Sequence, residues 1–414
     1  MPPESDLSRS SSYWGSIVGQ PFVTVSPVGT SSGYPTNNGA NYGPDTPGTV
    51  SSGLFEALNA LQTIGGVIFL LPGTFKIAGT ATIPNITHSI VIMGSGMYTS
   101  IIQRADTSGN SLMTLVQNAS SPLEPAIAFL DVGFDMNNKA GTMINVFVGG
   151  SGTSFAPVTF DRFLVIGKGS SSGSFLYVNG GAGYVGGRLL MKDFLIPSMA
   201  GGDFADVGQM RDFAIEDGLI YSATSSPLFV LYPGSLNMTA RNVRLINTST
   251  SGANALFSVW FSANNQAYGT ISLTDCEVID GSYLLILDSP GSTEFTGCTI
   301  NRILIRGGSI SGLSGGIFRV TNTVPTYSIA IRDVYGYNPQ AASGPTSAGT
   351  SPYTWPLLPY DANYVLVAQN GQSALSLDGK PIAFTLAAPV FVAAGHTLIS
   401  TWSGTAPTYD ILPI

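Results

Sequence analysis

Charged side chains are scarce in this chain of 414 residues. Asp, Glu, Lys and Arg together make up 10% of it, against roughly 25% in an average globular protein. Disorder does not explain the scarcity, because 44% of the residues are apolar and can build a core. We therefore expect a surface of Ser, Thr, Asn and Gly, which suits harsh extracellular conditions or a protein packed into an assembly. The net charge of -8, with no basic stripe, argues against a nucleic-acid partner.

Residues that commonly build reactive sites are equally few. The two cysteines, Cys276 and Cys298, supply neither a disulfide framework nor a zinc quartet. The two histidines, His88 and His396, fall in different parts of the chain and support no Ser-His-Asp or metal-His set. We therefore expect no metal and no cofactor.

No segment has the pattern of a signal peptide or a membrane span. The first six residues are polar and acidic, and the longest apolar run, Val67 to Leu71, is far too short to cross a bilayer. We expect either that a signal has been removed or that the protein reaches its destination without secretion, as virion components do.

A short phrase recurs instead: Asp, Asn or once Gly, followed by apolar, any and apolar residues. Its copies stand 19 to 36 residues apart and begin at Asp131, Asp161, Asp193, Asp212, Asn242, Asp275, Gly297 and Asp333. A short strand after a turn residue, repeated at such intervals, predicts a solenoid. We interpret the Asp/Asn column as structural, because these residues favour tight turns and tolerate a left-handed backbone. The apolar residues expected to point inward are Val132, Phe163, Phe194, Phe213, Val243, Cys276, Cys298 and Val334.

Residues 53–63 form the clearest helix pattern, with Leu54, Phe55, Leu58 and Leu61 on one face and Ser51 or Ser52 as the cap. The stretches G-G-V-I-F-L-L-P-G-T-F-K-I and I-V-I-M-G-S-G follow it. Over about residues 50–104 this arrangement resembles the entry to the pectate-lyase-like right-handed parallel β-helix superfamily. The resemblance implies a capping helix and stacked coils; it implies little about function, because that superfamily includes lyases, hydrolases and viral tailspikes.

Four regions are expected. Residues 1–50 are a Ser/Gly/Pro-rich segment, and 51–338 form the parallel β-helix. Residues 339–359 are a linker, and 360–414 form a small antiparallel β-sandwich with a hairpin turn at Asp378-Gly379, closing the C-terminal end. The first segment is either a disordered tail or an extended anchoring arm. The aromatic residues that would anchor such an arm are Tyr13, Trp14, Phe22 and Tyr34.

Cys276 and Cys298 hold the same place in two successive phrases. If one coil separates them, they stack; we favour two free core thiols, with a disulfide as the alternative.

Four carboxylate pairs could in principle serve a glycosidase. They are Asp131 with Asp135, Asp203 with Asp206, Glu216 with Asp217, and Glu277 with Asp280. None lies in a polygalacturonase-type motif, and we expect Arg244 and Glu277 to form a cross-coil ion pair. Aromatic residues in or beside the long intervals suit sugar rings and subunit packing equally well. Our candidates for contacting a glycan or receptor are Tyr184, Tyr232, Trp260 and Tyr268.

We therefore expect a non-catalytic surface protein of the viral spike or tail-fibre type, located on a virion or outside the cell. It would associate as a trimer, attach to a virion or surface assembly through its N-terminal arm and contact a host glycan. An extracellular polysaccharide lyase or hydrolase is one alternative. A cell-surface structural or filament protein is another.

Overall fold

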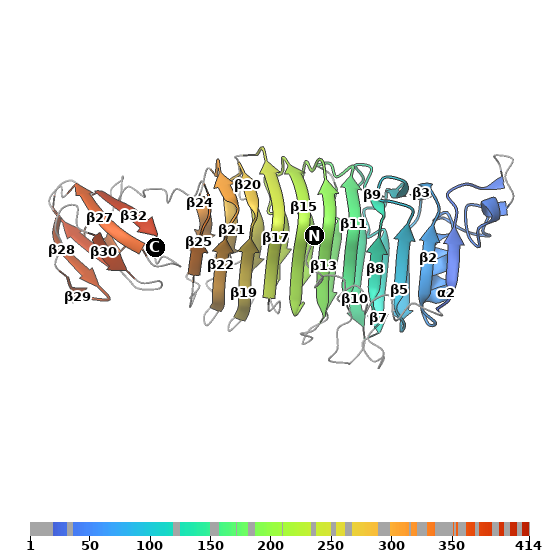
Figure 1. Ribbon diagram of the computed structural model, residues 1–414, viewed down its shortest axis with the longest axis horizontal. Helices are drawn as coiled ribbons and strands as arrows, with labels where there is room; N and C mark the ends of the chain where they lie inside the picture. The colour runs from blue at the N-terminus through green and yellow to red at the C-terminus, as the bar shows by residue number, and fades with distance from the viewer. Residues whose placement is uncertain are drawn as a thin grey trace, which may run out of the picture.

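The chain folds into a right-handed parallel β-helix followed by two small antiparallel sheets (Figure 1). The computed structural model describes the following residues: 20–30, 36–118, 125–149, 157–170, 172–180, 187–208, 210–232, 237–249, 254–260, 267–288, 299–313, 316–320, 329–335, 351, 353–354, 362–368, 372–382, 389–392, 398–403 and 408–413. The parallel β-helix expected from the sequence is confirmed.

The β-helix has three faces, which we number in the order that the chain reaches them within one coil. Face 1 contains β1 (Phe22–Val25), β2 (Gly66–Leu70), β5 (Ile90–Gly94), β8 (Ile127–Leu130), the first halves of β11 (Val158–Ile166), β13 (Arg188–Ile196), β15 (Asp212–Ser222) and β17 (Asn237–Asn247), then β19 (Ala267–Thr274), β22 (Thr299–Arg306) and β25 (Ile329–Arg332). Face 2 contains β3 (Gly73–Ile77), β6 (Ser100–Arg104), β9 (Gly133–Asp135), the second halves of β11, β13, β15 and β17, then β20 (Glu277–Ile279) and β23 (Ser309–Ser311).

Face 3 is a separate nine-stranded sheet. It contains β4 (Ala81–Ile86), β7 (Met113–Asn118), β10 (Ile144–Gly149), β12 (Leu176–Gly180), β14 (Ala205–Gly208), β16 (Phe229–Leu231), β18 (Ala255–Trp260), β21 (Tyr283–Asp288) and β24 (Gly316–Val320). Neighbouring strands on all three faces are parallel, so equivalent residues of successive coils stack along the axis.

Faces 1 and 2 meet at a column of residues with left-handed backbone. Their φ angles lie between 50° and 64°, and the column contains Asp131, Arg162, Asp193, Asp217, Asn242, Asp275, Gly307 and Asp333. The strand registers on either side place these residues at equivalent positions of successive coils. A left-handed residue turns the chain sharply, and Asp, Asn and Gly adopt this conformation most readily. The structural role predicted for the Asp/Asn phrase is therefore confirmed.

The assignment of the phrase was wrong in three coils. Arg162 occupies the turn position expected for Asp161, Asp217 the one expected for Asp212, and Gly307 the one expected for Gly297. Asp212 instead begins β15, where it pairs with Arg188 of β13.

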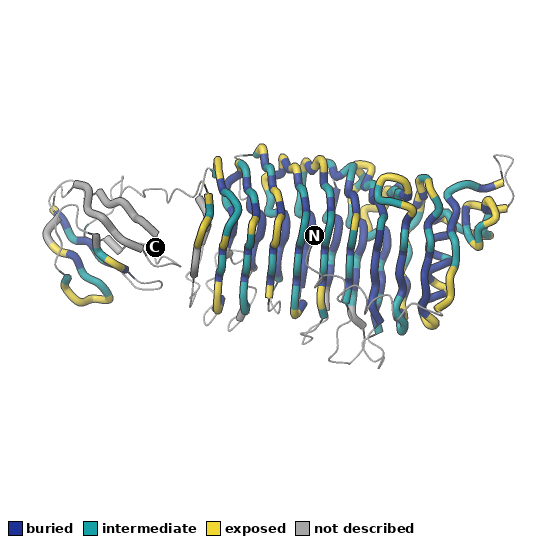
Figure 2. The backbone as a smooth tube through the Cα atoms, viewed as in Figure 1, coloured by how far each residue is buried: buried dark blue, intermediate teal, exposed yellow. Residues whose placement is uncertain are grey.

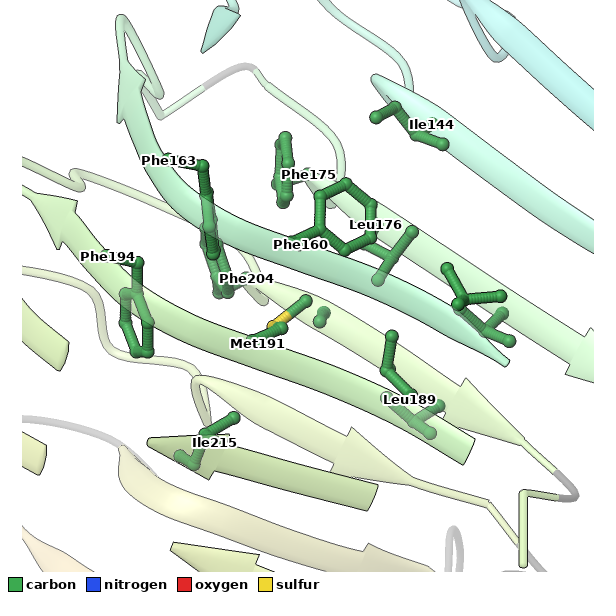
Figure 3. Close-up of a cluster of buried hydrophobic side chains, with 14 of the residues drawn as sticks. Ile144, Phe160, Phe163, Phe175, Leu176, Leu189, Met191, Phe194, Phe204 and Ile215 are labelled. Atoms are coloured by element: carbon green, nitrogen blue, oxygen red, sulfur yellow. The ribbon is translucent and has the colours of Figure 1, made fainter. Parts of the chain in front are cut away.

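The core fills the space between the three faces (Figure 2). Phenylalanines from successive coils stack within it, with ring centroids 5.3 Å apart for Phe163 and Phe194, and 5.1 Å for Phe175 and Phe204 (Figure 3). Of the residues expected to point inward, Val132, Phe163, Phe194, Phe213, Val243 and Cys276 are buried. Val334 is partly buried against the core, and Cys298 lies outside the described residues.

The stacking expected for the two cysteines was wrong. In the strand register Glu277 lies beside Arg244 of one adjacent coil and Ser309 of the other. Cys276, which precedes Glu277, therefore lies between Val243 and Gly308 of those coils. Cys276 is a buried free thiol.

The N-terminal helix α2 (Leu54–Leu61) buries the apolar face expected for it. Its N-cap is Gly53, while Ser51 Oγ accepts a hydrogen bond from Phe55 N at 2.9 Å. Before it come the short 3-10 segment η2 (Thr36–Gly39) and strand β1, which pairs with β2. The stacked strands thus begin within the range 1–50 that we expected to form a tail or an arm.

The C-terminal region forms two antiparallel sheets, as expected for a small β-sandwich. One contains β26 (Tyr353–Thr354), β31 (Leu398–Trp402), β28 (Gln372–Leu377) and β29 (Lys380–Pro381). The other contains β30 (Pro389–Val392), β27 (Ala362–Ala368) and β32 (Thr408–Pro413). Asp378 and Gly379 both have positive φ, 50° and 75°, and form the predicted hairpin turn between β28 and β29.

Candidate functional site

The outer surface of face 3 carries the best-equipped cluster of polar and aromatic side chains among the described residues. Successive side chains of a strand point to opposite faces. In β12, Leu176 and Val178 belong to the core, so Tyr177 between them points outward. The register places Asn145 of β10 on one side of Tyr177 and Asp206 of β14 on the other. Asn145, Tyr177 and Asp206 therefore form an outward row across three coils.

Aromatic rings flank this row. The ring of Phe147 in β10 meets the ring of Tyr177 edge-on, with centroids 6.1 Å apart. Tyr232 directly follows β16 and is half-buried. Asp206, Tyr177 and Asp203 all act electrostatically on the Tyr232 hydroxyl, so these four side chains share one neighbourhood. Rings presented on a sheet surface offer flat apolar faces beside hydrogen-bonding groups.

Asp206 is the central polar residue and is only 9% exposed. Ser174 Oγ donates a hydrogen bond of 2.5 Å to its Oδ2. Its other oxygen, Oδ1, is buried and has no hydrogen-bond partner among the described residues; the same is true of Asn145 Oδ1. Buried acceptors are normally paired, because an unpaired one costs free energy. These two buried, unpaired acceptor oxygens lie on either side of Tyr177.

Lys168 stabilises the turn beside this cluster. Its ammonium is buried and donates to the main-chain oxygens of Gly201 at 2.6 Å and Gly173 at 3.0 Å. Burial lowers its pKa to about 8, although the carboxylates of Asp203 and Asp206 oppose this change. The hydrogen bonds to two main-chain oxygens give Lys168 a structural role.

The two carboxyl groups of the cluster hold their protons unusually well. Burial raises the pKa of Asp203 to about 6; the charge of Asp206 raises it further, and Lys168 opposes the rise. Burial also raises the pKa of Asp206, against the hydrogen bond from Ser174 and the charge of Lys168. Burial, followed by the two carboxylates and Tyr177, raises the pKa of Tyr232 to about 12. Near neutral pH Asp203 is therefore a carboxylate and Tyr232 a neutral phenol.

Among the four residues expected to contact a glycan, Tyr232 lies in this cluster. Trp260 is the last residue of β18. Because Val259 pairs with Leu231, the backbone of Trp260 lies beside that of Tyr232. The side chain of Trp260 is outside the described part of the chain. Tyr184 lies outside the described residues altogether. The expectation for Tyr268 was wrong: its side chain is 2% exposed and donates a hydrogen bond to Leu231 O at 3.1 Å inside the core.

Of the expected anchoring residues, only Phe22 is described. It is 59% exposed, and its ring stacks on that of Phe69, with centroids 6.1 Å apart. Tyr13, Trp14 and Tyr34 lie outside the described residues.

In each of the other three carboxylate pairs considered from the sequence, one member forms an ion pair along the β-helix. Asp131 pairs with Arg162, and Glu216 pairs with Arg241. Arg244 Nε lies 2.8 Å from Glu277 Oε2 in the next coil, which confirms the expected cross-coil pair. In the fourth pair, burial raises the pKa values of both Asp203 and Asp206.

Within the described ranges, no three His, Cys, Asp or Glu side chains gather in a way that could hold a metal ion. No helix in that part of the chain is long and apolar enough to cross a membrane.

No protein-family model matches the chain, and no curated protein matches it. Several solved structures are similar to it in architecture. ORF18 of Geobacillus virus E2 is 14% identical, with 99% of this chain and 81% of that chain covered and a TM-score of 0.47. The tailspike protein of Acinetobacter phage vB_ApiP_P1 is 12% identical, with coverages of 92% and 89% and a TM-score of 0.32.

Pectin methylesterase PemA from Erwinia chrysanthemi is 15% identical, with 55% of this chain and 75% of that chain covered and a TM-score of 0.32. At these identities and scores the comparisons assign neither residues nor an activity to this chain.

Proposed function

We propose that this protein is a structural and attachment protein of a virion surface or another extracellular surface, and that it binds a glycan on the outer surface of face 3. The observation that carries the proposal is the row Asn145, Tyr177 and Asp206, with an unpaired acceptor oxygen on each side of an outward aromatic ring. A sugar ring supplies the complement, because it has an apolar face of C–H groups and hydroxyl donors at its edge.

The dimensions of the row suit an oligosaccharide. Adjacent strands of a sheet lie about 4.8 Å apart, so Asn145 and Asp206 are separated by about 10 Å. A sugar unit stacked on Tyr177 reaches both acceptors with its hydroxyl groups, while Phe147 and Tyr232 extend the aromatic surface to either side. Because these residues lie on paired strands, the site is formed before the ligand arrives and loses little entropy on binding.

Electrostatics narrows the class of glycan. Asp203 and Asp206 lie together in a chain whose net charge is -8. An acidic sugar placed there would be repelled by the carboxylates. The ligand we propose is therefore a neutral or amino sugar.

The same proposal covers the partners of the protein. We expect several copies to associate, as a trimer, and the aromatic residues Tyr13, Trp14, Phe22 and Tyr34 to anchor the protein to a virion or surface assembly. The exposed Phe22 ring, stacked on Phe69, supports this role for the N-terminal end of the β-helix.

Hydrolysis of the bound glycan is the second candidate function. It is favoured by Asp203, whose pKa of about 6 suits a general acid, beside a second carboxyl group. Binding is the better supported of the two, because Ser174 already donates a hydrogen bond to one oxygen of the second carboxyl group, Asp206 Oδ2.

A glycan array probed with the full-length protein tests the proposal. We expect binding to neutral or amino-sugar oligosaccharides. Incubation of the bound glycans with the protein, followed by assay of reducing ends, separates the two candidates. Release that Asp203→Asn abolishes would establish the enzyme, whereas binding without release supports attachment. An array with no neutral or amino-sugar ligand would refute both.

A further inference from the structure

The outer surface of face 1 carries a small apolar cluster that is separate from the core. Val67, Val91 and Ala128 are equivalent residues of β2, β5 and β8, which lie side by side in Figure 1. Leu130 stands two residues beyond Ala128 in β8. The residues that alternate with these four along each strand face the core, so the four side chains point outward. They are nevertheless buried, with exposed fractions of 6%, 2%, 0% and 8%. We call them the outer cluster.

Ala128 and Ala214 give a matched comparison within one row of face 1. Thr159, Leu190 and Ala214 continue the row of Ala128 into β11, β13 and β15, and all three are only partly buried. The same side chain at an equivalent position of the sheet is therefore fully covered in one coil and partly exposed in another. Strand formation does not account for this difference, so something lies over the outer cluster.

Neighbouring side chains explain one end of the outer cluster only. Phe22 continues the row into β1 beside Val67, and its ring stacks on that of Phe69. Ala128 is three strand spacings, about 14 Å, away from Phe22. Of the described apolar side chains outside the outer cluster, Met93 alone packs against it, and Met93 is itself only partly buried.

Three stretches outside the described ranges adjoin the face 1 strands of these coils: residues 1–19, 119–124 and 150–156. The second and third are short and fixed at both ends, so no residue in them reaches more than about 12 Å from those ends. Leu130 is about 16 Å by strand rise beyond the end of residues 119–124, and Val67 is three strand spacings, about 14 Å, from the strand that follows residues 150–156. Neither stretch spans the outer cluster.

Residues 1–19 have the necessary reach. They lead through Gln20 into Pro21, whose main-chain oxygen accepts a hydrogen bond from Val67 N at 2.9 Å. The segment thus joins the sheet beside the first residue of the outer cluster, and nineteen extended residues reach about 60 Å. At the far end Asp161 is the coil neighbour of Leu130, and its Oδ1 is buried with no hydrogen-bond partner among the described residues. Main-chain N–H groups of an extended segment are suitable donors for such an oxygen.

The same segment has apolar side chains at a matching spacing. Adjacent side chains of an extended chain point to opposite sides, so Tyr13 and Ile17 share one side while Trp14 and Val18 share the other. Four residues of extended chain span about 13 Å. This is close to the distance of about 12 Å that strand spacing and rise give between the two ends of the outer cluster.

We infer that residues 1–19 dock on the outer cluster of their own chain, with one aromatic and one aliphatic residue covering it, either Tyr13 with Ile17 or Trp14 with Val18. The second aromatic residue then points away from the β-helix, where it serves the anchoring role proposed above. The inference rests on the proposed function for that role alone; it does not depend on glycan binding.

Thiol accessibility in the full-length chain tests the docking, with Ala128→Cys compared to Ala214→Cys. Each protein is treated with N-ethylmaleimide under native conditions, and the rate of alkylation at the introduced thiol is read by mass spectrometry of its peptide. We expect the thiol at position 128 to react at least tenfold more slowly than the thiol at position 214. Equal rates would mean that nothing covers the outer cluster in solution and would overturn the inference.

Two double variants then identify the cover: Tyr13→Ser with Ile17→Ser, and Trp14→Ser with Val18→Ser. We expect at least one of them to raise the rate at position 128 to that at position 214. The rate at position 214 should stay unchanged, which shows that the β-helix remains folded. Protection of position 128 that survives in both double variants would overturn the inference.

A photo-cross-link leaves the segment unaltered and keeps the test decisive if a double variant misfolds. With p-benzoyl-phenylalanine in place of Met93, at the edge of the outer cluster, we expect cross-links to residues 1–19 within one chain. Cross-links to residues 119–124, to residues 150–156 or to a second chain would overturn the inference. Glycan binding by the same protein is a separate readout, and its absence beside an intact intrachain cross-link would refute the proposed function alone.

Discussion

Arg162 donates two hydrogen bonds to Asp131 of the preceding coil, 2.6 Å from Nε and 2.8 Å from Nη2, and both residues have a left-handed backbone. Their φ angles are 52° and 56°. An arginine thus stands in the column where the other coils have Asp, Asn or Gly. Its side chain is 48% exposed, so the ion pair contributes at most about 1 kcal/mol, and the backbone conformation is the stronger constraint at this position.

Two substitutions of Arg162 separate these effects. Arg162→Asn loses the ion pair but tolerates positive φ, and we expect a loss of no more than about 1 kcal/mol. Arg162→Val adds a β-branched side chain at φ 52° and should cost about 2–3 kcal/mol. Urea denaturation measures both. Equal losses for the two variants would mean that the turn imposes no conformational requirement.

The same column shows how far the sequence predicts the fold. The phrase located the turn at Asp131, Asp193, Asn242, Asp275 and Asp333, because Asp and Asn tolerate a left-handed backbone. It failed at Arg162, because arginine is uncommon at a left-handed turn position and the ion pair with Asp131 of the preceding coil cannot be read from the local pattern. It failed at Asp212 because that residue begins a strand, where its half-buried side chain pairs with Arg188. Local propensity identifies the repeat, whereas stacking between coils decides its register.

Gly218 leaves room for the ring of Phe194. A Cβ at Gly218 would lie 2.1 Å from Phe194 Cζ, and Phe194 itself stacks on Phe163. We expect Gly218→Ala to destabilise the protein by about 1–3 kcal/mol, because the ring must leave its place in the core. In a Phe194→Leu background the same change should cost clearly less. A double-mutant cycle with no coupling would show that the core relaxes around the methyl group.

Cys276 should be chemically silent in the folded protein. Burial raises the pKa of its thiol to about 11, and the thiolate is the reactive form. In a Cys298→Ser background, which removes the second thiol, we expect no labelling by a disulfide reagent at pH 8 until the protein is unfolded. Rapid labelling of the native protein would place the Cys276 sulfur at the surface and contradict the register of β20.

The candidate site was harder to predict than the fold. Tyr232 and the pair Asp203 and Asp206 could be named from the sequence, but not Asn145 or Tyr177. The alternation in Phe175-Leu176-Tyr177-Val178 does place Tyr177 outside, yet only the register between coils brings it beside Asp206. The prediction for Tyr268 failed because its position in β19 directs its ring into the core.

The contribution of Asp203 to the free energy of unfolding should fall as pH rises from about 4 to about 6. The folded state binds this proton with a pKa of about 6 and the unfolded state with the ordinary 3.8. Between these values the folded state holds more protons, so deprotonation favours unfolding. Asp203→Asn should reduce the fall by about 1–2 kcal/mol, less than the full shift implies because the side chain is partly exposed. Urea titrations at several pH values test this, and an unchanged slope in the variant would contradict it.

The central claim is that the ring of Tyr177, between Asn145 and Asp206, holds a sugar on face 3. The most direct measurement is the affinity of the best array glycan for Tyr177→Ala, with Tyr98→Ala as the matched control. Tyr98 is 60% exposed and lies in the turn after β5, away from face 3. We predict that Tyr177→Ala weakens binding at least tenfold by calorimetry, as loss of an aromatic contact at the centre of a site does, while Tyr98→Ala binds as the wild type. Unchanged affinity of a folded Tyr177→Ala protein would contradict the claim.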